Sequence, residues 1–149
     1  MERWTIAVVA ATCAMVGAVA ARQAGGTPQT YKGLELKVTG IQRAPTASLR
    51  DCPPGANTVK ATAKPGEQFA IVSIAVKVLP GYQPSPLKRP SVTDAAGMTH
   101  NTAATFVDVG SVPEFSCAFP FRLPQGTRLK TFQVETASFD VTALDPGKN

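Results

Sequence analysis

Residues 114–123 read EFSCAFPFRL, one of the clearest patterns in the chain. Its apolar side chains occupy every second position, namely Phe115, Cys117, Phe119, Phe121 and Leu123. Because successive side chains of a strand point to opposite faces, this alternation predicts a strand with one buried face. We expect this strand to be central to the core, since several phenylalanines share that face. Pro120 donates no backbone hydrogen bond, so part of the strand should lie at an edge or a bulge.

The same alternation recurs on both sides of this stretch. Between Phe69 and Val78, valine and isoleucine share one face, and such β-branched residues favour a strand over a helix. Leu34 to Val38 also alternates, and Gly40 after it indicates a β-bulge or a bend. Further strands are expected at residues 58–63, 91–94, 102–109, 130–134 and 139–143, with a break near residues 135–138.

The pattern as a whole indicates an all-β domain. About seven short strands with frequent Pro and Gly turns and no helical period predict an immunoglobulin-like antiparallel β-sandwich. A closed barrel would give the same linear pattern and stays open as an alternative. The chain is 44% hydrophobic and 17% charged, a balance typical of a folded domain rather than a disordered chain.

The first residues predict export. Arg3 precedes an uncharged run from Trp4 to Ala21, and Ala18-Val19-Ala20 has the small-x-small pattern that signal peptidase accepts. We therefore expect a signal peptide at residues 1–20 and an extracytoplasmic protein, periplasmic or secreted. The run approaches the roughly 20 residues of a transmembrane helix, but it contains no Leu. Membrane contact is expected only if the leader is retained as an anchor, and Cys13 lacks the surroundings that lipidation needs.

The rest of the chain divides simply. Residues 21–30 have no apolar period and predict a flexible linker, residues 31–145 the sandwich domain, and residues 146–149 a tail. The net charge is +5 and the pI is near 9.4. The basic residues are scattered, with no aromatic residues between them, so this charge indicates ordinary solubility and no nucleic-acid partner.

Cys52 and Cys117 are the cysteines that remain once the leader is removed. A pair of cysteines in an oxidising compartment predicts a disulfide. Closing so long a loop stabilises the fold by about 4 kcal/mol in the chain-entropy model. Two free thiols, one of them buried, are the alternative.

Four segments carry a resemblance to a known family: Leu34 to Val38, Gly66 to Val72, Ser91 to Gly97 and Phe119 to Gly126. In this order they resemble an immunoglobulin-like domain of unknown function that occurs in many exported bacterial proteins and lipoproteins. The third segment resembles the family's strand-Asp-Gly turn, and the fourth its apolar strand ending in Pro-x-Gly. The family usually has Asn after its second strand, where this chain has Val78-Leu79-Pro80. The resemblance implies a sandwich in an extracytoplasmic location, and it supplies no catalytic residues.

Catalytic and metal chemistry find little support in the residues. His100 is the only histidine, so a Ser-His-Asp or Cys-His arrangement would have to use it. No serine lies in a G-x-S-x-G turn, and Cys117 is expected to pair with Cys52, so we expect no enzyme and no cofactor. Met98 and His100 place two soft ligands close together, but a blue-copper site needs two histidines and a cysteine.

We therefore expect a non-enzymatic binding module for an unknown protein or envelope component. Binding residues usually lie on loops that a rigid scaffold positions, which points to residues 51–57 and 82–89. Within the second loop, Tyr82, Lys88 and Arg89 are the residues we predict to contact a partner. The alternative is an extracytoplasmic copper carrier that uses Met98 and His100.

Overall fold

The computed structural model describes residues 26–147, and the regular structure in this range is β-strand. The central pair is β5 (Glu67–Val78) and β8 (Glu114–Pro124), which run antiparallel over almost their whole length. Ile74 lies opposite Cys117, and Val72 lies opposite Phe119. The apolar alternation of both strands therefore points to one face, as the sequence predicts.

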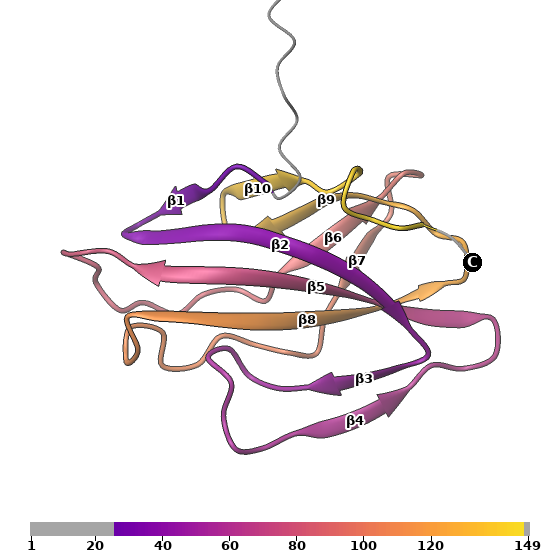
Figure 1. The fold of residues 1–149 in the computed structure, drawn as a ribbon, viewed down its shortest axis with the longest axis horizontal. Helices are drawn as coiled ribbons and strands as arrows, with labels where there is room; N and C mark the ends of the chain where they lie inside the picture. Colours follow the sequence, from indigo (N-terminus) through magenta and orange to yellow (C-terminus); the bar gives the residue numbers. More distant parts are fainter. Residues whose placement is uncertain (1–25, 148–149) are drawn as a thin grey trace, which may run out of the picture.

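Two four-stranded antiparallel sheets make up the domain (Figure 1). The first has the order β1 (Gln29–Tyr31), β2 (Leu34–Ala44), β5 and β8. The second has the order β10 (Ala137–Asp140), β9 (Leu129–Val134), β6 (Ser91–Asp94) and β7 (Thr99–Asn101). A separate hairpin consists of β3 (Thr46–Leu49) and β4 (Val59–Thr62), and Figure 1 shows it beside β8. This arrangement confirms the predicted β-sandwich.

The core lies between the two sheets and is dominated by aromatic and β-branched side chains. Phe132 of β9 has its ring centroid 6.3 Å from that of Phe119 and 6.2 Å from that of Phe121, both on β8. All three side chains are fully buried. Aromatic pairs at such distances and tilted angles add to the stabilisation that burial provides, so this cluster holds the sheets together.

Hydrogen bonds also join the two sheets along both sides of the sandwich. The side-chain amide of Gln29 on β1 donates to the carbonyl of Ser138 on β10, and the Ser138 N–H donates back to the Gln29 oxygen. On the opposite side, Thr102 forms a single β-bridge with Phe121 of β8. The edge strands are thus partly covered, which limits pairing with other chains.

A β-bulge interrupts β2, as Gly40 predicts. The register with β5 shifts between Val38 and Gly40. One extra residue reverses which side chains face the core. After the bulge the odd-numbered residues face inward, so Arg43 enters the space between the sheets.

Several strand predictions need correction. The described residues contain ten strands rather than about seven, because β1, β3 and β7 are short and carry little apolar signal. Residues 102–109 form isolated bridges instead of the expected strand. The last strand is Ala137–Asp140 rather than 139–143, and the expected break is a tight turn at Glu135, whose φ is 51°. The first strand begins at Gln29, within the expected linker.

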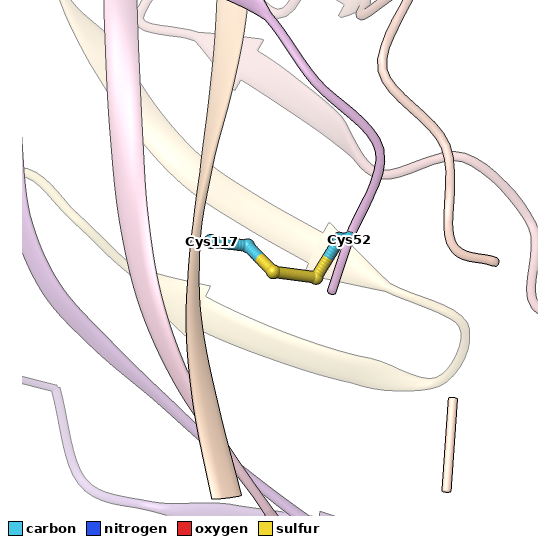
Figure 2. Close-up of a disulfide and its surroundings, with 2 residues drawn as sticks. All are labelled: Cys52 and Cys117. Atoms are coloured by element: carbon cyan, nitrogen blue, oxygen red, sulfur yellow. A yellow bond between two sulfur atoms is a disulfide. The ribbon is translucent and has the colours of Figure 1, made fainter. Parts of the chain in front are cut away.

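The predicted disulfide between Cys52 and Cys117 is present (Figure 2). The Cα atoms are 5.6 Å apart, within the usual range for a disulfide. Backbone hydrogen bonds hold Cys52 as well, since its N–H donates to Thr105 and its carbonyl accepts from Val107. The loop after β3 is therefore fixed to β8 and to the segment that follows β7.

The predicted signal peptide, the first part of the linker and the end of the tail lie outside the described residues. Between residues 26 and 147, no helix has the length and apolar character that a membrane crossing requires.

Candidate binding groove

The centre of the solvent-facing side of the first sheet carries small side chains. Gly40 of β2 pairs with Ser73 of β5, which pairs with Ala118 of β8. In the next row, Ala75 of β5 pairs with Ser116 of β8. These residues alternate with the core residues of the same strands, so they form a low floor across three strands.

The hairpin of β3 and β4 forms one wall above this floor. Ala47 of β3 and Phe69 of β5 are buried although neither belongs to the core cluster between the sheets. Arg122 of β8 connects hairpin and sheet, because its guanidinium lies 5.4 Å from the centroid of the Phe69 ring and donates to the carbonyl of Thr62. The hairpin thus covers one end of the solvent-facing side and leaves the small residues beside it open.

The loop that the disulfide holds forms the second wall. Arg50, Asp51 and Pro54 lie next to Ser116 and Ala118 of β8, and together they border a hollow of about 360 Å³. Since Cys52 within this loop is bonded to β8, the wall has a fixed position relative to the floor.

Three adjoining hollows make up one groove. The largest, about 550 Å³, lies between the hairpin and the sheet, and the third, about 270 Å³, lies over the bulge of β2. The hollow beside the disulfide-held loop and the largest hollow share Ser48 and Ala118. The hollow over the bulge shares Gln42 with the largest hollow and Ser73 with the hollow beside the loop. We call this continuous depression the outer groove; its main residues are Thr39, Gly40, Gln42, Ser48, Arg50, Asp51, Lys60, Ser73, Ser116 and Ala118.

The groove offers hydrogen bonds and positive charge. The hydroxyls of Ser48, Ser73 and Ser116 and the amide of Gln42 line it. Its lining holds two cations, Arg50 and Lys60, and one carboxylate, that of Asp51. Among its described lining residues there is no aromatic ring and no histidine, and its one cysteine is oxidised in the disulfide. Such a lining can hold a polar ligand, but it supplies no evident nucleophile–base pair.

The residues predicted to contact a partner lie elsewhere, at the other end of the domain. Tyr82 is half-buried, and a Cβ placed on Gly33 or Gly110 would lie 3.0 Å from it. Its ring therefore packs against Gly110, and its Cα and Cβ pack against Gly33. Lys88 and Arg89 are exposed, and the Lys88 N–H donates to the carboxylate of Glu135 at 2.6 Å. Partner contact through these residues stays a prediction.

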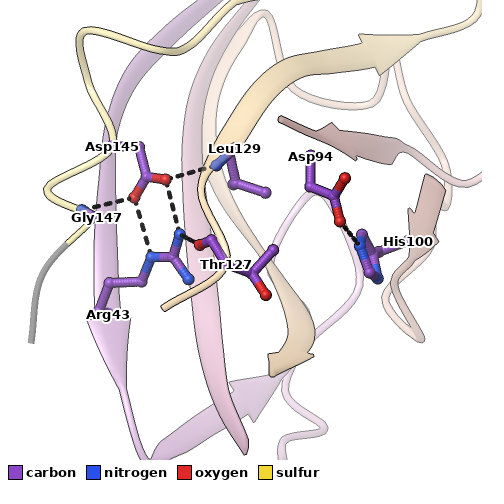
Figure 3. A network of polar contacts seen from close by, with 7 residues as sticks. All are labelled: Arg43, Asp94, His100, Thr127, Leu129, Asp145 and Gly147. Carbon is purple, nitrogen blue, oxygen red and sulfur yellow. Dashed lines mark hydrogen bonds and ion pairs between the residues drawn. The ribbon is translucent and has the colours of Figure 1, made fainter. Parts of the chain in front are cut away.

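Of the candidate copper ligands, Met98 lies in the turn between β6 and β7 with its side chain exposed, and His100 lies on β7. His100 Nε2 lies 2.8 Å from Asp94 Oδ2 (Figure 3). Asp94 Oδ1 also accepts the N–H groups of Ala96 and Met98. The hydrogen bond from His100, followed by that from Met98, lowers the pKa of Asp94 below its usual value. Within residues 26–147, no three His, Cys, Asp or Glu residues gather around a common point. Copper binding through Met98 and His100 stays a prediction.

The ion pair between Arg43 and Asp145 was not predicted from the sequence. Both side chains are buried, and Arg43 donates from Nε and Nη2 to the two carboxylate oxygens at 3.0 and 2.7 Å (Figure 3). The N–H groups of Leu129 and Gly147 donate to the same carboxylate. Burial alone raises the pKa of Asp145, but the hydrogen bonds from Arg43 and Leu129 outweigh it and leave that pKa below its usual value. This network ties the end of the chain to β2.

The sequence prediction found one part of the groove and missed the rest. Asp51 belongs to the candidate loop at residues 51–57. The sequence pattern places the floor residues of β5 and β8 on the outward faces of two strands and does not indicate a groove there. The available signal was the repeated use of Ala and Ser at residues 73, 75, 116 and 118, where exposed strand positions usually hold larger side chains.

No model of a protein family matches this sequence, and no curated protein matches it. Among solved structures, the chain is similar to an uncharacterized β-sandwich protein from Clostridium difficile. The two share 8% sequence identity, and the match covers 76% of this chain and 87% of that chain with a TM-score of 0.48.

Proposed function

We propose that this protein is an extracytoplasmic, non-enzymatic binding module whose immunoglobulin-like sandwich presents the outer groove to an envelope component. The observation that carries this proposal is the floor of small side chains on three adjacent strands between two walls. A ligand can approach the backbone of the sheet closely at Gly40, Ser73 and Ala118, because the side chains at these positions are small.

The disulfide supports the location. Disulfides form and persist in oxidising compartments such as the periplasm or the extracellular space. Here the bond between Cys52 and Cys117 is buried and also positions one wall of the groove. If the two cysteines are oxidised only after export, the loop that forms this wall becomes fixed in the compartment where the protein acts.

The lining of the groove supports binding rather than catalysis. General acid–base chemistry needs a titratable group positioned at the ligand, most often histidine. His100 instead contacts Asp94, and neither residue lines the groove. The serine hydroxyls in the groove therefore act as hydrogen-bond partners.

Site-specific photo-crosslinking in cells that export the protein tests this function. A benzophenone amino acid placed at Ser116, in the groove, should give a discrete adduct of higher mass. The same group at Lys130, an exposed residue of β9 in the other sheet, is the control and should give none. Adding Ala118→Trp, which fills the floor, should remove the adduct. Equal adducts from both positions, or none from either, would reject the groove as the binding surface.

A further inference from the structure

We propose that the ligand of the outer groove is an extended acidic peptide segment of another extracytoplasmic protein. This inference rests on the proposed function and adds the chemical class of the ligand. Three features of the groove support it: the shape of its floor, the absence of aromatic side chains among its described lining residues, and the excess of positive over negative side chains.

The shape of the groove suits an extended backbone. Neighbouring strands lie about 4.8 Å apart, so the row from Gly40 through Ser73 to Ala118 spans roughly 10 Å. The hollow beside Arg50 and Pro54 continues this row, which by itself accommodates about three extended residues at roughly 3.3 Å each.

The lining favours a peptide over a glycan. Sugar rings expose C–H faces that proteins commonly hold by stacking them on aromatic side chains, and no aromatic side chain lines the described groove. Peptide N–H and C=O groups instead need donors and acceptors spaced along a path. Ser48, Ser73 and Ser116 provide both from different strands, and Gln42 extends the path at the bulge end.

The charges favour an acidic ligand. Arg50 and Lys60 are exposed at separate walls, and neither has an ion-pair partner among residues 26–147. Asp51 is the single carboxylate that lines the groove. Carboxylates of a bound peptide would therefore meet cations on both walls, which steers association and sets specificity.

Fluorescence anisotropy of the oxidised, exported protein tests the ligand class. The probe is a labelled hexapeptide of alternating alanine and glutamate, and the comparison is the same peptide with lysine in place of glutamate. We expect the acidic peptide to bind and the basic peptide to bind at least about tenfold more weakly. Combining Arg50→Glu with Lys60→Glu should weaken the acidic peptide about tenfold or more, and added salt should do the same in the parent protein.

Two variants control this measurement. Lys130→Glu makes the same kind of charge change on the opposite sheet and should leave the affinity within about twofold. Ala118→Trp should abolish binding while the far-ultraviolet circular dichroism keeps its β character, which separates a filled groove from an unfolded protein.

The other outcomes overturn the inference in distinguishable ways. Stronger binding of the basic peptide that Ala118→Trp abolishes would reject an acidic ligand and leave the proposed function standing. Binding of polygalacturonate without binding of the acidic peptide would replace the peptide with an acidic glycan. No binding of any probe, together with no adduct at Ser116, would reject both the ligand class and the function.

Discussion

The two faces of the first sheet come from the same strands but differ in the size and burial of their side chains. On the core face of β5, Val72, Ile74 and Val76 are fully buried and pack against the second sheet. On its other face, Ser73 and Ala75 are small and partly exposed, and Ser73 lines the outer groove. Because alternate residues of one strand supply both faces, stability and binding can be changed separately. The large side chains of the core face hold the two sheets together, while the small side chains at the centre of the other face form the floor of the outer groove.

The core face should respond most strongly to truncation. Phe119 is fully buried, and its ring centroid lies 5.1 Å from that of Phe106. Phe119→Ala should lower the free energy of unfolding by about 4 kcal/mol, through lost burial and the cavity left behind. Urea titration measures this loss, and Ser116→Ala on the other face of β8 is the matched control, expected within about 0.5 kcal/mol. Equal losses in both variants would contradict the contrast between the faces.

Removing the disulfide tests the link between the two faces. Cys117 points into the core, yet its bond to Cys52 holds a wall of the groove on the other side. Cys52→Ala combined with Cys117→Ala should cost about 4 kcal/mol, because 65 residues separate the cysteines and the unfolded chain gains freedom. The calorimetric melting temperature should fall in the double variant and, by a similar amount, in the reduced parent protein. An unchanged melting temperature in both would contradict a stabilising role.

The ion pair at the end of β2 should contribute less than these apolar and covalent contacts. Asp145→Asn removes the charge that faces the buried Arg43 guanidinium but keeps one oxygen as an acceptor. We expect a loss of about 2 kcal/mol in the free energy of unfolding, since hydrogen bonds to charged groups contribute more than neutral ones. Adding Arg43→Met to Asp145→Asn removes the cation that the single variant leaves buried without a counter-ion, so the double variant should lose no more stability than Asp145→Asn alone.

This contribution should depend on pH in one direction. The pKa of Asp145 is lowered in the folded state from an ordinary value of 3.8, so the carboxylate stabilises the fold at pH values above 3.8. That stabilisation is lost as the pH falls below 3.8 through the folded pKa. The difference between the parent protein and Asp145→Asn should therefore shrink between pH 5 and pH 2. A difference that grows on acidification would reverse the sign and reject the assignment.

The turn between β6 and β7 should show a smaller effect. Asp94 accepts two backbone N–H groups and one from His100, whereas His100 makes a single contact with it. Asp94→Ala should therefore lower the melting temperature more than His100→Ala, and less than Asp145→Asn lowers it. The same series measured with one equivalent of copper checks the carrier hypothesis, since a metal-dependent rise that His100→Ala abolishes would support it.

The core face could be predicted from the sequence, and the reason is physical. Large apolar side chains at every second position of β5 and β8 have one favourable arrangement, and the two cysteines needed only an oxidising compartment. Even the bulge in β2 followed from Gly40. The ion pair that the bulge makes possible could not be predicted, because the inward position of Arg43 becomes favourable only with a buried carboxylate beside it. Asp145 lies 102 positions later, and nothing local to either residue indicates the contact.

The groove could not be predicted for a related reason. Alanine, serine and glycine have weak hydrophobic and strand preferences, so their alternation does not say whether they lie in the open or beneath another element. The hairpin that forms a wall is also short, and Ala47 is the one buried residue of β3. Likewise, Tyr82 is apolar enough to suggest a contact surface, while its packing against Gly33 and Gly110 depends on a distant part of the chain.

The solvent-facing side should respond least in stability and most in binding, which completes the comparison. Ala118→Thr adds two heavy atoms above an exposed strand position, and threonine suits such positions, so the free energy of unfolding should stay within about 0.5 kcal/mol. The same atoms stand on the floor where the hollows beneath the hairpin and beside the loop meet, and they should weaken the acidic hexapeptide severalfold. Urea titration and anisotropy on one preparation measure both effects. Equal affinity at unchanged stability would mean that the ligand does not reach the floor, and the small residues of this face would then need another explanation.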